Sequence, residues 1–247
     1  MAGHNNKIAV ITGAAGALGR EFALALAQRG CDIAIADIKD ASEVEAEIRA
    51  LGRRVYSEIV DLSDNNQVAQ FAANVLTGFG RVDILINNAA YMPVVPLADL
   101  DINEFKKFEA INVEAAFILA KRFGSGMVER GYGRILQIAS STTGTPMPGF
   151  SAYVTTKMAG IGLTRALAAE FSSNGVRVNA LSPGLTRTPE SAKNLPPELF
   201  DAVKNNLQLI KQTEEPQDLV GAMLYLTSEE CGFVTGQVIN CDGGVNF

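Results

Sequence analysis

The chain has 247 residues and a formal net charge of -6, with 47% apolar and 19% charged residues. This is an ordinary globular balance and enough chain for a well-buried core. The negative charge argues against nucleic acid or an anionic membrane as a partner, because both select basic surfaces. The longest apolar runs are strand-length, and the N-terminal stretch lacks the pattern of a secretory signal. Because the three cysteines are few and scattered, we expect no disulfide framework, no metal and a cytoplasmic location.

The only histidine of the chain is His4. It lies so close to the N-terminus that we expect a frayed segment there. Ser-His-Asp hydrolysis, H-E-x-x-H zinc chemistry and histidine acid/base catalysis would then lack their central residue. The sequence therefore predicts a chemistry without imidazole.

Short runs rich in Val, Ile and Leu alternate with longer stretches in which apolar residues recur at helical spacing. The expected strands are 7–12, 32–37, 54–61, 82–87, 133–140, 176–182 and 237–242. Near-continuous apolar strands between helices indicate a parallel sheet that is covered on both faces, and right-handed crossovers make it doubly wound. With no linker or repeat in 1–247, we expect an α/β single-domain Rossmann fold of about seven strands.

The stretch "TGAAGALG" (12–19) follows the first expected strand and opens a helical pattern. Its glycines are spaced G-x-x-G-x-x-G, whereas the usual dinucleotide fingerprint is G-x-G-x-x-G. A strand, a turn and a helix in this order present backbone N–H groups to a pyrophosphate. The second strand ends in Asp37, 18 residues after Gly19, where a carboxylate can bind a ribose and repel a 2′-phosphate. This favours NAD over NADP, although Asp37 could instead cap the next helix.

"SAYVTTK" (151–157) places Tyr153 and Lys157 four residues apart, hence on one face of a helix. Tyrosine normally titrates near ~10, and a nearby ammonium lowers its pKa by stabilising the phenolate. Such a pair is an acid/base for interconverting an alcohol and a carbonyl. The alternative is an ordinary exposed pair of helical side chains.

Taken in order, the motifs of the chain resemble those of the short-chain dehydrogenase/reductases from Lys7 to Gly244. The matching pieces are the glycine turn, "VDLSD" around Asp61, "NNAA" (87–90), "INVEAAF" around Asn112, "GRILQIASS", the Tyr153–Lys157 pair, "VNALSPGLTRT" (178–188) and "TGQVINCDGG" (235–244). The resemblance implies a dinucleotide-binding first half, a catalytic and substrate-binding second half, and a homotetramer.

The resemblance also implies a catalytic set. Tyr153 corresponds to the acid/base, Lys157 to the residue that lowers its pKa and binds the nicotinamide ribose, and Asn112 to an asparagine that holds a proton relay. The serine that polarises the substrate oxygen has two candidates. We choose Ser140, 13 residues before Tyr153, over Ser141, which lies three residues before Gly144. Either serine could instead bond backbone in a loop.

By the same resemblance, an NAD cofactor would contact six groups of residues. They are the turn (Thr12, Gly13, Gly16, Ala17, Leu18, Gly19), Asp37, the pair Asp61 and Leu62, the segment Asn88, Ala89 and Ala90, the pair Tyr153 and Lys157, and the segment Pro183, Gly184, Thr186 and Thr188. Asp61 could instead cap a helix over 64–77, and Asn87 and Asn88 could simply form a turn.

Two alanines stand where the family has glycine. Ala90 closes "NNAA", and Ala17 takes the middle glycine position of the first turn. A positive φ at Ala17 would cost on the order of 1 kcal/mol. We therefore expect an ordinary helical φ at Ala17 and no loss of cofactor binding.

The residues expected to face the substrate are mostly apolar. Besides Ser140 and Tyr153, they are Tyr91, Met147 and Phe150, with Met92, Pro93, Val94 and Pro148 around them. They suit an uncharged, hydrophobic or aromatic secondary alcohol and its ketone, although each could be plain core or an interface. The irregular stretch 183–215 could be a lid or a long loop.

Two other functions remain open. One is a reductase working in the opposite direction, for instance on a 3-oxoacyl thioester. Asp37 disfavours it, because such family members tend to use NADPH. The other is an NAD-binding sensor or scaffold without turnover, from which we would expect a missing catalytic residue.

Overall fold

All strands of the central sheet run parallel, as expected. The computed structural model describes residues 3–247, and within that range one sheet contains seven strands in the order β3-β2-β1-β4-β5-β6-β7. The strands are β1 (Ile8–Thr12), β2 (Asp32–Asp37), β3 (Val55–Ile59), β4 (Ile84–Asn87), β5 (Gly133–Ile138), β6 (Val176–Pro183) and β7 (Val238–Cys241). Each expected strand is present, and its ends differ from the expected ones by at most two residues. The predicted α/β Rossmann fold is confirmed.

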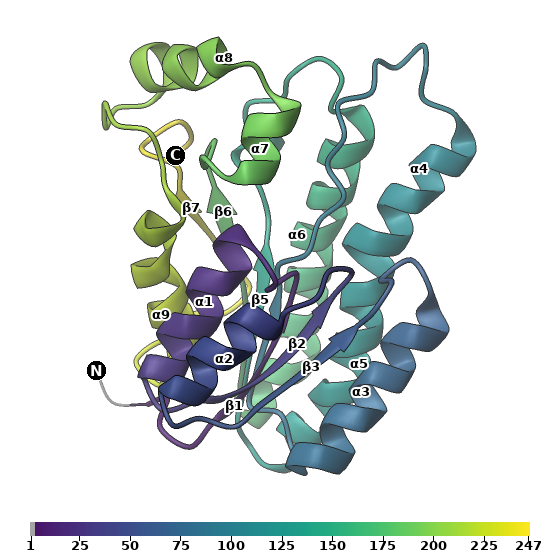
Figure 1. The fold of residues 1–247 in the computed structure, drawn as a ribbon, viewed down its shortest axis with the longest axis vertical. Coiled ribbons are helices and arrows are strands. Elements are labelled where there is room, and N and C mark those ends of the chain that lie inside the picture. The colour runs from purple at the N-terminus through teal and green to yellow at the C-terminus, as the bar shows by residue number, and fades with distance from the viewer. Residues whose placement is uncertain (1–2) are drawn as a thin grey trace.

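Three helices cover one face of the sheet (Figure 1). They are α1 (Ala17–Gln28), α2 (Ser42–Ala50) and α9 (Val220–Thr227). Their apolar sides bury Phe22, Leu26, Ile48 and Met223 against the strands. Burying a large apolar side chain contributes about 1.5–3 kcal/mol, so this layer is a main source of the stability of the sheet.

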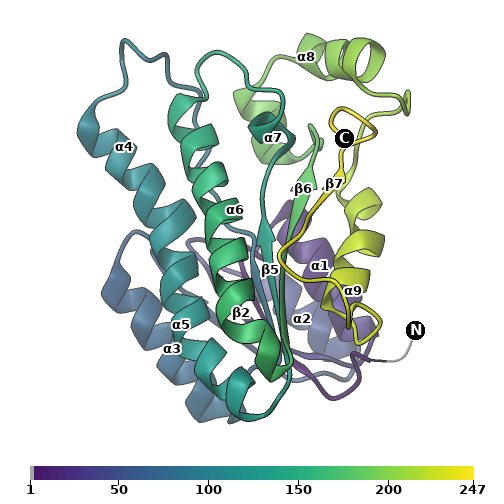
Figure 2. The same ribbon diagram turned by 180° about the vertical axis from the view of Figure 1, so that it is seen from behind.

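Helices α3 (Asn65–Phe79), α5 (Ala115–Glu129) and α6 (Ser151–Phe171) cover the other face (Figure 2). They bury Phe71, Leu119 and Phe123 in a second core. Helix α4 (Ile102–Glu109) continues into α5 through a π-helical turn, Ala110–Glu114. None of the helices described in residues 3–247 has both the length and the apolar character that a membrane crossing requires.

The strand order reverses direction at β1 and β4, which are neighbours in the sheet. Such a reversal opens a crevice at the carboxyl ends of the strands, where ligands bind in open α/β sheets. The irregular stretch 183–215 lies at this end and contains α7 (Pro189–Asn194) and α8 (Pro197–Ala202) (Figure 1). Both helices therefore lie at the carboxyl ends of the strands, where the predicted cofactor and substrate residues also lie.

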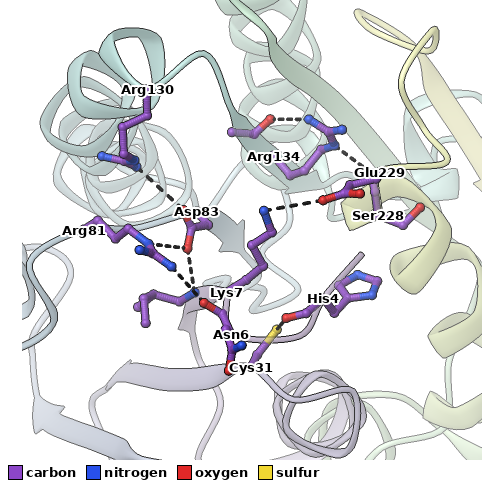
Figure 3. Close-up of polar contacts among 12 residues, drawn as sticks. His4, Asn6, Lys7, Cys31, Arg81, Asp83, Arg130, Arg134, Ser228 and Glu229 are labelled. Carbon is purple, nitrogen blue, oxygen red and sulfur yellow. Dashed lines mark hydrogen bonds and ion pairs between the residues drawn. The ribbon is translucent and has the colours of Figure 1, made fainter. Parts of the chain in front are cut away.

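His4 lies at the opposite ends of the strands, their amino ends, and our expectation of a frayed segment there is wrong. The side chain of His4 is only 2% exposed, and its Nε2 lies 3.0 Å from Thr227 Oγ1. The His4 carbonyl accepts a hydrogen bond from the Cys31 thiol (Figure 3). Burial lowers the pKa of His4. Tertiary contacts therefore hold this residue, at the amino ends of the strands and away from the ligand-binding edge.

The polar network around the start of β1 is structural (Figure 3). Asp83 accepts hydrogen bonds from the Ile8 backbone at 2.9 Å and from Arg81 Nε at 3.0 Å. The buried Arg134 donates from Nε to the Ser228 carbonyl at 2.7 Å. These contacts satisfy polar groups that would otherwise be buried without a partner.

Candidate functional site

The glycine turn between β1 and α1 is braced by its own polar groups. Thr12 Oγ1 accepts hydrogen bonds from the backbone nitrogens of Asn88 and Ala89, at 3.0 and 3.1 Å. The Asn88 amide donates to the carbonyls of Thr12 and Gly13. Thus the residues that follow β4 hold the turn that follows β1. Asn88 acts as this brace, and not merely as part of a local turn.

The three glycines of the turn differ in what a side chain at their position would meet. Gly13 has φ +70°, and a Cβ there would lie 2.8 Å from the Cα of Ala89. A Cβ on Gly19 would overlap the Gly13 carbonyl oxygen. A Cβ on Gly16 would meet no protein atom within 4 Å. Gly16 is exposed, so the space beside it is open to solvent and the turn is unobstructed there.

Ala17 differs from the sequence expectation. Its φ is +42°, in the left-handed region, and not the helical value that we predicted. The preceding Gly16 is extended, at φ -150°, so the chain enters α1 by an abrupt change of direction at residue 17. Glycine adopts this conformation without strain, whereas a methyl group makes it cost about 1–2 kcal/mol.

Replacing Ala17 with glycine is expected to stabilise the protein. The substitution removes backbone strain from the folded state but increases the entropy of the unfolded chain. The first effect is larger by about 0.5–1 kcal/mol, which corresponds to a Tm increase of about 1–4 °C. The matched control is Ala166→Gly, at an exposed position within α6, which should lower the free energy of unfolding by about 1 kcal/mol. Thermal and urea unfolding measure both effects. Equal destabilisation by the two substitutions would rule out a strained Ala17.

The beginning of α1 fits a phosphate group. No side chain caps its first turn, so backbone N–H groups at the positive end of the helix remain available. Open space at Gly16 lies directly before them. This arrangement could hold the diphosphate of a dinucleotide.

Asp37 reaches the same turn from the end of β2. Its Oδ2 accepts a hydrogen bond from the Ala15 nitrogen at 2.8 Å, and its Oδ1 accepts one from the Lys39 nitrogen at 2.9 Å. The side chain is buried. A carboxylate offers about four acceptor positions, so about two remain for hydroxyl groups such as those of a ribose. Asp37 does not cap α2, whose N-cap residue, Ala41, has no side-chain hydrogen bond.

Asp61 and Leu62 follow β3, the strand that pairs with β2. Asp61 Oδ1 accepts hydrogen bonds from the backbone nitrogen and the hydroxyl of Ser63, and these bonds lower the pKa of Asp61. The residue that caps α3 is Asp64, which accepts from the nitrogens of Asn66 and Gln67. The capping alternative for Asp61 is therefore wrong. Leu62 is buried.

Tyr153 and Lys157 share one face of α6, as predicted, and both are buried. The Lys157 nitrogen lies 5.4 Å from the centre of the Tyr153 ring and donates to the Ile138 carbonyl at 2.7 Å. The exposed-pair alternative is thus wrong. The geometry brings a phenol and an amine together at the end of β5.

The pKa of Tyr153 is shifted in the direction opposite to our expectation. Burial raises it to about 12, and a hydrogen bond with Ser140 only partly counters this. Burial also lowers the pKa of Lys157 to about 8, which weakens the charge that would stabilise a phenolate. Desolvation outweighs the pair interaction in the chain alone. An acid/base role for Tyr153 therefore needs further positive charge, which an oxidised nicotinamide would bring.

Ser140 and Ser141 occupy different surroundings. Ser140 contacts Tyr153, and its Oγ accepts hydrogen bonds from the nitrogen and hydroxyl of Thr142. Ser141 begins a short 3-10 turn, and its carbonyl accepts from the Asn246 amide at 3.1 Å. The contact with Tyr153 favours Ser140. Asn246, in the C-terminal tail, also accepts from Thr145 Oγ1, so the tail braces this loop, which the sequence did not indicate.

Asn112 lies within the π-helical turn between α4 and α5, a kind of irregularity that is frequent at functional sites. Its Oδ1 accepts from the Tyr91 nitrogen at 2.7 Å, and its Nδ2 donates to the Tyr91 carbonyl and to Thr156 Oγ1. Thr156 in turn donates to the Tyr153 carbonyl. Asn112 thereby connects the end of β4 to α6. Thr156 was not among the predicted site residues, although it lies inside "SAYVTTK".

The segment after β6 places Pro183 at the end of the strand and Gly184, Thr186 and Thr188 beyond it. Both threonine hydroxyls are engaged within the protein. Thr186 Oγ1 donates to Glu214 Oε1 at 2.5 Å, and Thr188 caps α7 in a reciprocal arrangement with Ser191. The backbone nitrogens of Gly184, Thr186, Arg187 and Thr188 also donate hydrogen bonds within the protein, so the segment is held rigidly. Glu214 was not foreseen.

An apolar cluster surrounds Tyr153. Phe150 packs edge-on against its ring, with centroids 5.9 Å apart, and Leu195 and Phe200 join from the 183–215 region. This region therefore includes a cover over the site and not only a loop. Met147 and Phe150 also line a hollow of about 590 Å³ beside α6. Tyr91 is held by a hydrogen bond from its hydroxyl to Glu104 and by edge packing on Phe108.

Comparison with known proteins agrees with the fold. Residues 13–246 match a protein family described as enoyl-(acyl carrier protein) reductase. A 2,5-dichloro-2,5-cyclohexadiene-1,4-diol dehydrogenase from Sphingobium indicum is 33% identical over 247 residues, covering 99% of this chain and 98% of the relative. The chain belongs to the short-chain dehydrogenase/reductase family of oxidoreductases.

Two solved structures show the breadth of the family. A 3-oxoacyl (acyl-carrier-protein) reductase from Agrobacterium tumefaciens C58, with NADP bound, has a TM-score of 0.91 and 29% identity, covering 98% of this chain and 95% of that chain. An NAD⁺-bound xylitol dehydrogenase has a TM-score of 0.90 and 29% identity, covering 98% and 99%. Family membership alone therefore does not determine the cofactor or the substrate.

Proposed function

We propose that the protein is an NAD-dependent dehydrogenase that interconverts an uncharged, hydrophobic or aromatic secondary alcohol and its ketone. The observation that carries the proposal is the meeting of Tyr153, Ser140 and Lys157 at the edge of the sheet that also holds the glycine turn and Asp37. When bound, NAD⁺ supplies the acceptor for a hydride. The residues of the chain do the remaining work.

In this proposal Tyr153 removes the hydroxyl proton of the alcohol while Ser140 donates a hydrogen bond to the same oxygen. Lys157 holds the nicotinamide ribose and adds positive charge near the phenol. Asn112 keeps the catalytic helix in register with the end of β4 through Thr156 and Tyr91. In the direction of reduction, Tyr153 returns the proton to the carbonyl oxygen.

Asp37 supports NAD as the cofactor. A buried carboxylate at the end of β2 can accept hydrogen bonds from ribose hydroxyls, whereas it repels a 2′-phosphate. The same residue disfavours the alternative of a 3-oxoacyl thioester reductase that uses NADPH. A silent NAD-binding protein is disfavoured because Asn112, Ser140, Tyr153 and Lys157 are all present.

The apolar cluster around Tyr153 supports a substrate without charge. Phe108, Phe150, Leu195 and Phe200 all belong to it. Arg187 stacks over the Phe200 ring at 5.1 Å, which places its guanidinium against an aromatic face. A ring-bearing alcohol fits such a lining. The relative that acts on a cyclohexadiene diol has the same general kind of substrate.

A substrate screen tests the proposal. Cyclic and aryl-alkyl secondary alcohols are offered with NAD⁺ and, separately, with NADP⁺, and the absorbance of the reduced nicotinamide is followed. We expect turnover of apolar alcohols with NAD⁺ and little with NADP⁺ or charged hydroxy acids. A flat response to every alcohol would favour the silent NAD-binding alternative, and a preference for NADP⁺ would contradict the role of Asp37.

We also propose a homotetramer. Phe117 of α5 is half exposed and lies beside an apolar hollow of about 550 Å³ between α3 and α5. Light scattering after size exclusion measures the assembly, and a monomer would contradict the proposal.

A further inference from the structure

Glu214 is a buried carboxylate that lies directly beneath the segment Gly184–Thr188. Its side chain is 5% exposed. Its Oε2 accepts a hydrogen bond from the Gly184 nitrogen at 3.1 Å, and its Oε1 accepts one from Thr186 Oγ1 at 2.5 Å. One side chain therefore holds two positions of a segment that lies 30 residues away in the chain.

The backbone of Glu214 holds the same segment. The Arg187 nitrogen donates to the Glu214 carbonyl at 2.7 Å, and Thr186 and Glu214 form a single parallel bridge. A Cβ on Gly184 would lie 2.8 Å from Glu214 Oε2 and 3.1 Å from the Asp242 Cα. A side chain at position 184 would therefore require Glu214 and Asp242 to shift. The position of Glu214 therefore determines the backbone conformation of the segment Gly184–Thr188.

This carboxylate is not stabilised by a nearby cation. In the described part of the chain, no lysine, arginine or histidine nitrogen forms an ion pair with Glu214. The titratable groups facing it are Asp242 and Cys241 at the end of β7 and Asp218 in the 3-10 turn before α9. A buried acid among acids costs stability, so it indicates a function more than a stabilising role.

We propose that Glu214 is a positioning residue that sets the conformation of Gly184–Thr188 and thereby the affinity for the nicotinamide end of the cofactor. This inference rests on the proposed function, in which the segment contacts NAD. Glu214 acts through the segment and does not touch substrate or cofactor itself.

The ionised and protonated forms of Glu214 hold the segment differently. The carboxylate accepts from both Gly184 and Thr186, whereas a protonated carboxyl must donate one hydrogen bond, so the Thr186 hydroxyl has to turn. Hydrogen bonds to an ionised acceptor are also the stronger ones. Burial raises the pKa of Glu214 to about 7, with Asp242 and Asp218 raising it further and the bonds from Thr186 and Gly184 opposing the shift. We therefore expect the affinity for the cofactor to increase as the pH rises through about 7.

The experiment compares NADH dissociation constants of the wild type and Glu214→Gln between about pH 6 and pH 8. In the wild type we expect the affinity to increase by about five-fold across this range, as one charge-assisted bond replaces a neutral one. Glu214→Gln should show no such increase and should match the wild type at low pH. The matched control is Glu215→Gln, which removes an exposed charge next in the chain and should keep the wild-type profile.

Two further readouts separate positioning from a merely structural role. Hydrogen exchange should be faster at the Gly184 and Arg187 amides in Glu214→Gln. The Tm of this variant should be higher than that of the wild type above about pH 7, because an acid with a raised pKa contributes stability below its unfolded pKa and loses it as the pH rises through the folded pKa. Thr186→Val should also remove the pH dependence of binding, by deleting one partner of the carboxylate.

An unchanged NADH affinity profile in Glu214→Gln, with unchanged exchange at Gly184 and Arg187, would overturn the inference while leaving the proposed function intact. Failure of the wild type to bind NADH at all would instead overturn the proposed function.

Discussion

Tyr153→Phe is expected to lose nearly all turnover while binding NADH as tightly as the wild type. The substitution removes only the hydroxyl that exchanges a proton with the substrate, and it leaves the ring in its apolar cluster with Phe150 and Phe200. Loss of a positioned acid/base typically lowers the rate by about 10²–10⁴-fold. The measurement is kcat with an alcohol from the screen, together with the dissociation constant of NADH.

The matched control for this prediction is Tyr132→Phe. Tyr132 lies between α5 and β5, and the Lys7 ammonium lies over its ring, at the amino ends of the strands and away from the site. Among residues 3–247 its buried hydroxyl has no hydrogen-bond partner, so removing it should leave turnover unchanged. Normal turnover in Tyr153→Phe would end the proposed mechanism. A parallel loss of NADH binding would mean that the phenol has a structural role.

Asp37→Asn is expected to weaken NADH binding by about 10- to 100-fold and to reduce the discrimination against NADPH. The change removes the charge that strengthens hydrogen bonds from ribose hydroxyls, and each such bond to a charged group is worth about 1.5–3 kcal/mol. It also removes the repulsion of a 2′-phosphate, and the exposed cation of Lys39 lies two residues further along the chain. Dissociation constants of NADH and NADPH measure both effects.

Asp40→Asn is the control for Asp37→Asn, because Asp40 is exposed, carries the same charge and makes its hydrogen bonds locally to Ser42. We expect this variant to bind both cofactors as the wild type does. If Asp37→Asn kept its affinity for NADH, the ribose would be bound elsewhere. If both variants gained NADPH affinity equally, the effect would come from the general field and not from a contact of Asp37.

Much of the fold was predictable because the information is local. The seven strands were found from their apolar runs, and the parallel sheet follows from their alternation with helices. The pairing of Tyr153 with Lys157 follows from the helical repeat. Asp37 was located from its position after the second strand, where a parallel sheet collects strand ends at one edge.

The errors arose where tertiary contacts outweigh local patterns. His4 was expected to fray, but Thr227, more than two hundred residues away, binds its ring. Ala17 was expected to be helical, but the turn imposes φ +42° on it. The pKa of Tyr153 is raised by burial, which no spacing reveals.

Residue spacing and periodicity were thus sufficient for the sheet and for the shared helix face of Tyr153 and Lys157, because these depend on neighbours in the chain. The family followed from the resemblance of the motifs in their order. The contacts of Glu214 with Gly184 and Thr186, and of Asn246 with Ser141, depend on segments that only folding brings together. Desolvation likewise depends on how many atoms surround a group in three dimensions. The raised pKa of Tyr153, the lowered pKa of Lys157 and the raised pKa of Glu214 therefore follow from the packed structure and not from the order of residues.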